Sequence, residues 1–329
     1  METEKTISAL FQFLSLGKIL PPVTPVSGGL MHRMYRVNTA DHSYAVKHLN
    51  PEIMKRPNVM ENYRKAEALE KIIGDAGIPV VAALTINGRK MQEVENEFFY
   101  IFPWQNGSIT DWNNITPEQC RQAGTIQARI HALQPRYTDH ADPELSAVNW
   151  SEYIAESDRQ SSVITPMLKE NEQLLNDAQD ALNNARLALP GIECITNDDM
   201  DPKNIMWDKG KPVMIDLECL DYGNPVSSVI QLSLQWSGIT TCTLDLKKVK
   251  AFFDGYLENW DNGFRDYGSV MGLAYTWIEW LEYNITRVLR HCRDEDERAI
   301  GVSEVRNTIN RIRYIREKED QIRNLLERI

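Results

Sequence analysis

Apolar and polar positions follow different spacings in the two parts of the chain. Between residues 22 and 102, short apolar runs separated by turns predict an antiparallel sheet with one interposed helix. The runs read PPVTPV, HRMYRVNT, SYAVKHL, PVVAALTI and EFFYIF, and an Asn87-Gly88 turn joins the last two. Beyond this region the spacing becomes helical. We therefore expect an α+β chain, with a small antiparallel-sheet lobe over 1–103 and a larger, mainly helical lobe over 104–329.

The interposed helix is predicted over residues 59–76. Its apolar side chains recur at a helical spacing, and Gly77 followed by Pro79 ends it. Asn58 stands directly before the helix and Glu61 three residues later, which predicts a capping pair at its start.

Helices dominate the second part of the sequence. Thr116, Pro117 and Gln119 form a complete helix start, because each residue type suits its position in a capped first turn. Further helical runs are predicted over 151–160, 165–188, 245–260, 268–292 and 303–328. Apolar positions at helical spacing in the last run predict packing on the lobe or on a second copy of the chain, as in a homodimer.

The composition is that of a globular protein, with 42% hydrophobic and 25% charged residues in a chain of 329. No apolar run approaches the roughly 18 residues that a membrane span needs, and the N-terminus lacks the basic start of a signal peptide. Five cysteines stand at wide spacings without a CxxC pair. These features predict a cytoplasmic protein with reduced thiols and no membrane partner.

The charge distribution narrows the class of ligand. The net charge of −11 argues against nucleic-acid binding. Residues 1–103 carry 12 Lys and Arg against 11 Asp and Glu, whereas the remainder carries 24 against 36. We therefore expect the second part to bind a cationic or metal-bridged small molecule rather than a free anion.

Carboxylates gather around one predicted hairpin, in the stretch NDDMDPKNIMWDKGKPVMID. Two apolar runs flank DKGKP, which we interpret as a five-residue turn. If Trp207 lies opposite Val213, then Asn204 lies opposite Asp216, where cross-strand side chains are neighbours. A carboxamide oxygen and a carboxylate so placed can hold one Mg²⁺. Asp199 precedes the hairpin and could reach the same space.

Other interpretations of this acidic stretch are a solvated loop, a calcium loop or a metal-dependent hydrolase site. A calcium loop starting at Asp199 fails, because Lys203 and Asn204 occupy positions that need an oxygen ligand and a glycine. The hydrolase has no histidine ligand at hand. The hairpin favours a metal and phosphate site over a solvated loop.

The spacing Asp199-x4-Asn204, followed by a hairpin ending in Asp216, resembles the catalytic and metal-binding loops of protein-kinase-like phosphotransferases. It is most similar to the aminoglycoside phosphotransferase family, with its choline-kinase-like members, whose motifs stand here as NDDMDPKNIM, IDLE and YGNP. The resemblance implies a bilobal protein-kinase-like fold. It also implies that Asp199 orients the acceptor as base, while Asn204 and Asp216 bind Mg²⁺.

The first lobe offers candidates for phosphate binding. Lys47 stands inside an apolar strand, where an unpaired lysine is costly, unless that strand is an edge and the lysine faces water. By resemblance it would contact the phosphates, held by Glu67 on the helix, with Glu70 as a rival partner. The loop SGGLMHR, with Ser27 and Gly28, would cover the phosphates or simply make a turn.

The joint between the lobes, FPWQNG, would bind adenine through main-chain groups if the resemblance holds. Pro103 can offer only its carbonyl, so Gln105 would supply the N–H. In QARIHAL, His131 corresponds to a histidine that braces the catalytic loop, and we do not expect it to act as a base.

The motif departs from the family pattern at three positions. Asn197 replaces a histidine, Asp198 a glycine and Asp201 a second histidine. Asparagine can hydrogen-bond but cannot change charge near neutral pH, and a second carboxylate beside Asp199 should raise the proton affinity of one of them. Asp201 is an acceptor contact or a solvated side chain. The site is tuned differently, or its catalysis is weakened.

The implied activity is transfer of the γ-phosphate of ATP or GTP to a hydroxyl of a small cationic or polyhydroxylated molecule. The alternative is a nucleotide-binding pseudokinase or interaction module without turnover. On the acceptor side, Trp277, Trp280 and nearby acids could hold an ammonium group, or they could form a buried aromatic helix face with exposed glutamates.

Overall fold

A computed structural model describes residues 2–26, 32–292 and 294–329, and these form two compact units. The first contains Met1–Asp111 and Asp199–Asp221, and the second contains Trp112–Asp198 and Tyr222–Ile329. The α+β class with an antiparallel N-terminal sheet and a helical C-terminal part is confirmed. The acidic hairpin, which we expected within the helical lobe, packs with the first unit instead.

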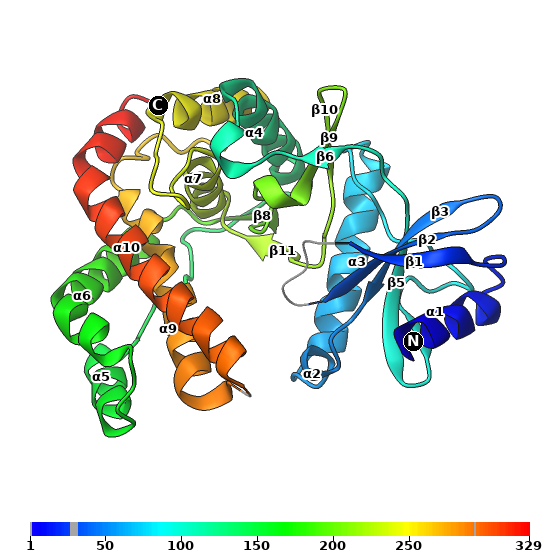
Figure 1. The fold of residues 1–329 in the computed structure, drawn as a ribbon. Helices are drawn as coiled ribbons and strands as arrows, with labels where there is room; N and C mark the ends of the chain where they lie inside the picture. The colour runs from blue at the N-terminus through cyan, green and yellow to red at the C-terminus, as the bar shows by residue number, and fades with distance from the viewer. Residues whose placement is uncertain (1, 27–31, 293) are drawn as a thin grey trace. The chain divides into compact units, whose positions relative to one another are not determined.

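The first unit is built on a five-stranded antiparallel sheet with the strand order β1-β2-β3-β5-β4. Figure 1 labels β1, β2, β3 and β5 of this sheet. Its strands are β1 Leu20–Val26, β2 Arg33–Asn38, β3 Ser43–His48, β4 Gln92–Val94 and β5 Glu97–Pro103. Three helices accompany the sheet, namely α1 Glu2–Phe13, α2 Pro51–Met54 and α3 Val59–Asp75.

Two details of this sheet differ from the prediction. The run PVVAALTI forms only isolated bridges, at Val80 and at Ile86. In its place the short strand β4 pairs with β5 through a two-residue turn, in which Glu95 and Asn96 have φ angles of 55° and 62°. Because this left-handed turn contains no glycine, its sequence does not indicate it.

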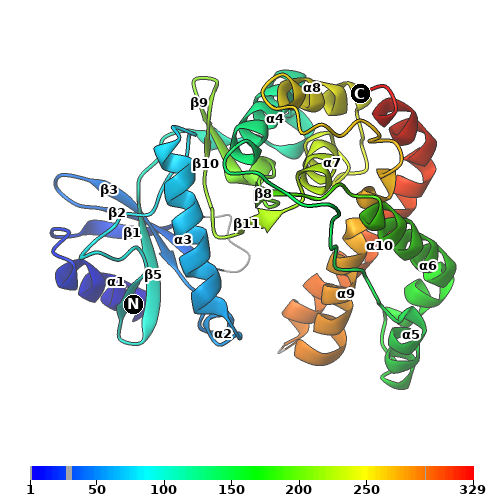
Figure 2. The ribbon, with the colours of Figure 1, turned by 180° about the vertical axis from the view of Figure 1, so that it is seen from behind.

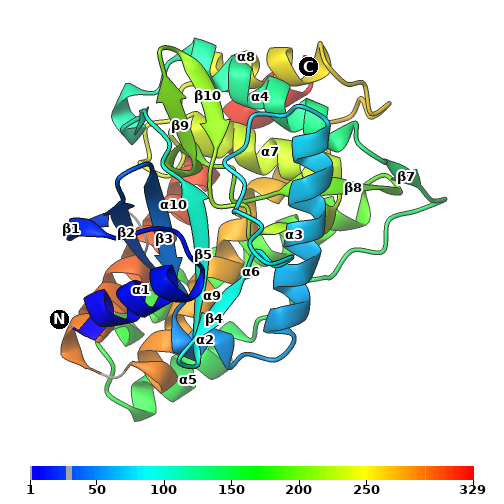
Figure 3. The same ribbon diagram turned by 90° about the vertical axis from the view of Figure 1, so that its right-hand side faces the viewer.

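Helices cover both faces of the sheet. The buried Phe11 of α1 shares a core with Phe99, whereas Tyr63 of α3 shares another with Tyr100. Figure 3 shows α1 and α3 on either side of β5. Burial on both faces explains why EFFYIF is apolar throughout instead of alternating. Helix α1 was not predicted.

The predicted capping pair of α3 is wrong, although its bounds are close to those expected. Asn58 has a left-handed φ of 61° and makes no side-chain hydrogen bond to the helix. The short helix α2 comes directly before it, and there Asn50 is the cap, accepting a hydrogen bond from the Glu52 N–H.

The acidic hairpin forms, but one residue out of the predicted register. It consists of β9 Ile205–Asp208 and β10 Lys211–Met214, with β6 Ser108–Ile109 beside β9. Trp207 lies opposite Pro212, and Asp208 lies opposite Lys211. The turn is therefore the two residues Lys209 and Gly210, with φ angles of 51° and 77°. Such a turn matches the twist of the strands better than the five-residue turn we expected.

The register decides where the two expected metal ligands lie. The Ile215 N–H donates to the carbonyl of Asn204 over 2.9 Å, so Asn204 is aligned with Ile215 and not with Asp216. Asp216 follows the strand in a left-handed conformation with φ 58°. The predicted cross-strand pair of Asn204 and Asp216 is thus wrong.

The second unit is mainly helical (Figure 2). Its helices are α4 Pro117–His131, α5 Trp150–Arg159, α6 Thr165–Leu187, α7 Pro225–Trp236, α8 Leu246–Leu257, α9 Trp277–Thr286 and α10 Glu295–Leu326. A small sheet has the order β11-β8-β7, with β7 Arg136–Tyr137, β8 Ile192–Asn197 and β11 Leu220–Gly223, of which Tyr222 and Gly223 belong to this unit. No helix in the described part of the chain combines the length and apolarity that crossing a membrane requires.

Most predicted helices of this unit are confirmed. Thr116 and Gln119 cap α4 reciprocally, as a capping box does. The run over 268–292 divides into a 3₁₀ segment, Met271–Thr276, then α9 and a π segment, Arg287–His291. Helix α7 was missed, because a helix buried nearly all round shows no polar face in its sequence.

Two glycines allow α4 and α8 to touch through their backbones. A Cβ on Gly124 would overlap the carbonyl oxygen of Phe252, and one on Gly255 would overlap that of Arg121. The crossing therefore needs glycine at both positions.

Candidate active site

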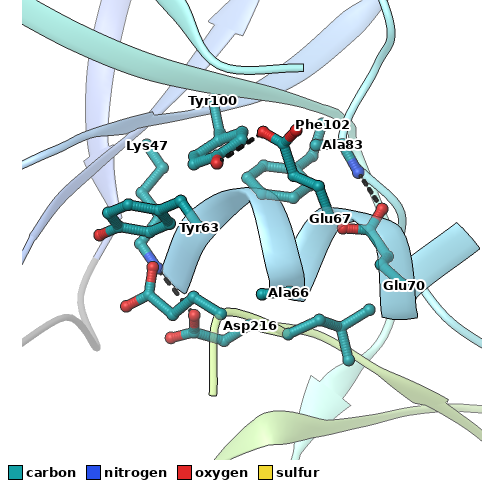
Figure 4. Close-up of a pocket in the computed structure, with 11 residues that line it drawn as sticks. Lys47, Tyr63, Ala66, Glu67, Glu70, Ala83, Tyr100, Phe102 and Asp216 are labelled. Atoms are coloured by element: carbon teal, nitrogen blue, oxygen red, sulfur yellow. Dashed lines mark hydrogen bonds and ion pairs between the residues drawn. The ribbon is translucent and has the colours of Figure 1, made fainter. Parts of the chain in front are cut away.

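Lys47 lies in the middle of the first unit's sheet with its side chain toward α3 (Figure 4). It is only 6% exposed, so the alternative of an edge lysine facing water is excluded. Its Nζ lies 2.7 Å from Asp216 Oδ1 and 2.7 Å from Glu218 Oε2. Burial lowers the pKa of Lys47, but the two carboxylates outweigh it and the pKa is raised. Lys47 is therefore a buried, charged ammonium.

Glu67 is not the partner of Lys47, contrary to expectation. It accepts a hydrogen bond of 2.8 Å from the Tyr100 hydroxyl, on the α3 side of the sheet (Figure 4). Glu70 is not the partner either, because it accepts from the Ala83 N–H at 3.0 Å and from Lys90 at 2.9 Å. Asp216 and Glu218, on the segment that follows the hairpin, neutralise Lys47 instead.

Glu218 is a site residue that the sequence analysis missed, although it is the glutamate of IDLE. His32 Nε2 lies 3.2 Å from its Oε1, while the Asn50 N–H donates to His32 Nδ1 at 3.0 Å. Since Nδ1 accepts, the proton of the ring lies on Nε2 and points to Glu218. Burial raises the pKa of Glu218, but His32 and Lys47 overcome this and lower it to about 2.

The loop before the hairpin brings Asp199 and Asn204 into direct contact. The Asn204 Nδ2 donates to Asp199 Oδ2 at 2.9 Å and to the Asp199 carbonyl at 2.7 Å. The other carboxylate oxygen, Oδ1, lies 2.8 Å from the Nζ of Lys203. Both oxygens of the predicted base are thus fixed by donors from its own loop.

Asp201 is buried, so its interpretation as a solvated side chain is wrong. It caps the 3₁₀ turn Pro202–Asn204 through the Lys203 N–H, and its Oδ2 lies 2.9 Å from the Lys203 Nζ. Burial raises the pKa of Asp201 to about 6, against the opposing charge of Lys203. Asp201 lies outside the pair Asp198 and Asp199, for which we expected a raised proton affinity, and its own raised pKa comes first from burial.

The other two departures from the family motif lie in the second unit. Ser228 on α7 donates to Asp198 Oδ1 at 2.5 Å, and Gln127 on α4 donates to Ser228 at 2.9 Å. Asp198 thus ties the start of the loop to two helices. Asn197 is buried, and its side-chain amide has no hydrogen-bond partner within the described residues.

His131 is a buried structural side chain. Its Nδ1 lies 2.8 Å from the Tyr256 hydroxyl on α8. Burial lowers the pKa of His131 to about 3, so the ring is neutral and unsuited to act as a base near pH 7. This hydrogen bond is with α8, and bracing of the catalytic loop itself stays a prediction.

The expected adenine contacts lie at the end of β5. The Trp104 N–H donates to the Ser43 carbonyl at 3.0 Å, and the Leu84 N–H donates to the Ile101 carbonyl at 2.8 Å. Carbonyls two residues apart on a strand point to the same side, so that of Pro103 points away from β3, as Ile101 does. This direction suits an adenine contact. Ser27 and Gly28 lie outside the described residues.

On the expected acceptor side, the aromatic residues of α9 divide into two groups. The guanidinium carbon of Arg311 lies 3.8 Å from the ring centroid of Trp277, so a cation of the protein already occupies that face. Trp280 stacks on Tyr283 with centroids 5.3 Å apart, and both are partly exposed. This second pair offers exposed ring surface to a ligand.

The donor set fits a divalent cation shared with phosphate. Asn204 uses its Nδ2 toward Asp199, which leaves its oxygen free to act as a ligand, and Asp216 uses only Oδ1 toward Lys47. No three His, Cys, Asp or Glu side chains of the described chain form a ready metal cluster. Mg²⁺ is commonly held by one or two side chains, with phosphates and water supplying the other ligands.

Solved structures share this fold. Spectinomycin phosphotransferase, solved with ADP and spectinomycin, is 13% identical, with a TM-score of 0.66 over 92% of this chain and 96% of its own. A microcompartment-associated aminopropanol kinase is 13% identical, with a TM-score of 0.62 over 95% and 98%. A choline/ethanolamine kinase family protein from Mesorhizobium loti is 13% identical, with a TM-score of 0.60 over the full length of both chains.

No curated protein matches the sequence. The family model described as the phosphotransferase enzyme family matches residues 22–273, which include Lys47, the Asp199–Asn204 loop and the hairpin. With the motif spacing and the fold in agreement, the chain belongs to the phosphotransferase enzyme family.

Proposed function

We propose that this phosphotransferase is a small-molecule kinase that moves the γ-phosphate of ATP or GTP to a hydroxyl of a cationic or polyhydroxylated acceptor. The observation that carries the proposal is the set of charges in the first unit. A buried ammonium, Lys47, contacts Asp216, and the same segment holds the joined pair Asp199 and Asn204.

Each residue has a role in such a transfer. Asn204 and Asp216 would hold Mg²⁺, which neutralises charge on the phosphates when bound. Lys47 would bind phosphate oxygens, exchanging part of its contact with Asp216 and Glu218 for them. Asp199 would accept a hydrogen bond from the acceptor hydroxyl and aim it at the phosphorus. Catalysis of this kind is mainly positioning and electrostatic stabilisation.

Charge and fold neighbours support the acceptor class. The second unit carries 21 Lys and Arg against 29 Asp and Glu, whereas the first carries 15 against 18. The neighbours include kinases for aminopropanol and ethanolamine, both of them amino alcohols. Excess negative charge on the unit expected to receive the acceptor suits a cation.

Replacing Asp199 by alanine tests the catalytic role. We expect Asp199→Ala to lower kcat by a factor on the order of 10² to 10⁴ and to leave nucleotide affinity largely unchanged, because the nucleotide is held by other residues. Steady-state kinetics and calorimetry measure the two effects. Asp208→Ala, on the hairpin that follows Asp199, is the control. Unchanged turnover in Asp199→Ala would reject this role.

Replacing Asp216 by alanine tests the metal. We expect Asp216→Ala to remove the Mg²⁺-dependent part of nucleotide binding, because one of the two side-chain ligands is lost. Calorimetric titrations with nucleotide in the presence and absence of Mg²⁺ measure this part directly. If the variant keeps the full Mg²⁺ dependence, Asp216 is not a ligand.

A nucleotide-binding pseudoenzyme is the second candidate, favoured by Asn197 in place of the motif histidine and by the two carboxylates on Lys47. Incubation with ATP, Mg²⁺ and a panel of amino alcohols, aminoglycosides, sugars and macrolides separates the two. A product heavier by one phosphate supports the kinase. Nucleotide binding without any such product supports the pseudoenzyme.

A further inference from the structure

We propose that Lys203 is a positioning residue that clamps Asp199 for phosphoryl transfer, and that Asp201 holds Lys203 in place. The inference rests on the proposed function and adds two residues to it. The family motif leaves position 203 open and has histidine at 201, so the motif alone does not imply the Asp201–Lys203 pair.

The clamp grips Asp199 from two sides. The Lys203 Nζ lies 2.8 Å from Oδ1, and the Asn204 Nδ2 lies 2.9 Å from Oδ2. Because the donors take different oxygens, they fix the plane of the carboxylate as well as its position. A carboxylate has about four acceptor sites, so each oxygen keeps one for an acceptor hydroxyl.

Lys203 needs support to act in this way. Its side chain is 46% exposed, and a long exposed lysine loses considerable rotamer entropy when it is held in one geometry. Asp201 supplies the support, because its Oδ2 lies 2.9 Å from the ammonium and its Oδ1 accepts the Lys203 N–H at 3.0 Å. Asp201 is 8% exposed, so the anchor is rigid.

A positioning role differs measurably from an ordinary salt bridge. An exposed ion pair four residues apart contributes little to stability, and Asp201 keeps the hydrogen bond from the Lys203 backbone N–H when the ammonium is removed. Loss of Lys203 should therefore leave folding nearly unchanged. A shift of about 1 Å in a reacting group, in contrast, can cost about a hundredfold in rate. Turnover should fall while substrate binding and thermal stability persist.

The first test replaces Lys203 with methionine, which keeps the length of the side chain and removes the charge. We expect Lys203→Met to lower kcat about tenfold to a hundredfold with little change in the KM of nucleotide or in Tm. Lys203→Arg should recover most of the loss, because guanidinium can also bridge two carboxylates. Lys211→Met, at an exposed lysine of the hairpin that follows Lys203, should match the wild type.

Asp201→Asn should lower kcat in the same direction, by less than Lys203→Met. The proposal is overturned if Lys203→Met keeps the wild-type kcat, or if kcat, KM and Tm change together without rescue by arginine.

A second measurement does not depend on turnover. The side-chain amide of Asn204 reports the clamp in nitrogen-15 NMR spectra of the full chain, because it donates to the same carboxylate. We expect its resonance to move in Lys203→Met and to stay in Lys211→Met. An unmoved resonance in Lys203→Met overturns the clamp even if no acceptor is ever found. Lack of product from the wild type, in contrast, counts against the kinase proposal alone.

Discussion

At the residue scale, the balance of charge around Lys47 is the feature that separates this chain from the expected arrangement. Glu67 does not neutralise Lys47, because its carboxylate accepts a hydrogen bond from Tyr100 instead. The negative charges beside Lys47 are those of Asp216 and Glu218. An isolated buried ammonium would be costly, and two carboxylates with good geometry offset that cost. In the proposed function, a nucleotide phosphate would therefore meet a lysine that is already paired.

The buried His131 predicts that the chain loses stability as the pH falls. Burial lowers its pKa to about 3 from an ordinary 6.5. Below pH 6.5, His131 is protonated in the unfolded chain but stays neutral in the folded chain. The free energy of unfolding therefore falls as the pH falls. Between pH 6.5 and about 3, the free energy of unfolding decreases by up to about 1.4 kcal/mol per pH unit.

Replacing His131 by asparagine tests this source. We expect the unfolding free energy of His131→Asn, measured by urea denaturation, to decline less steeply with falling pH over this range than that of the wild type. Parallel pH profiles would show that His131 does not titrate in this way.

At the scale of elements, sequence patterns predicted those with an amphipathic or alternating face and missed those without one. The bounds of α4 and α6 follow the prediction closely, because each has caps or prolines at its start and a polar face. Helix α7 is buried on nearly every side, so its sequence shows no polar face. The turn from β4 to β5 consists of Glu95 and Asn96, without the glycine that usually marks such a turn. Such elements are defined by what packs around them.

The glycine contact of α4 with α8 predicts a strong local requirement. We expect Gly124→Ala to destabilise the protein by about 1–3 kcal/mol or more, because a methyl group there meets the backbone of α8 and the helices must move apart. Gly74→Ala in α3 is the matched control, since its nearest neighbour would be 3.8 Å away. There we expect stabilisation by up to about 1 kcal/mol, from helix propensity.

Chemical denaturation of both variants measures the difference. Equal effects at the two glycines would mean that the helix contact is looser than the structure shows.

At the scale of the whole molecule, the chain passes through each compact unit twice. Asp199–Asp221 returns to the first unit and brings the expected base and metal ligands to the sheet that carries Lys47. The net charges of the two units are −3 and −8. This asymmetry leaves the second unit the more attractive to cations.

The charge asymmetry predicts a salt effect that depends on the acceptor. For a cationic acceptor we expect KM to rise several-fold between about 0.05 and 0.5 M NaCl, because the screening length shortens to a few ångström. For a neutral polyhydroxylated acceptor KM should stay nearly constant. Initial-rate measurements with one acceptor of each kind decide the matter. Equal salt effects on the KM of the two acceptors would mean that the negative charge of the second unit serves solubility and does not attract the acceptor.

The sequence by itself determined the α+β class, most helices and the motif spacing that places Asp199 near Asn204, because these depend on local periodicity and on residues close in the chain. Only the tertiary structure decided the hairpin register, the true partners of Lys47 and the role of Glu218. A shift of one residue moves every cross-strand neighbour, and a pair such as Lys47 and Glu218, 171 residues apart, forms only when distant segments pack together. The burial of Lys47, and which carboxylates pair with it, are properties of the folded chain.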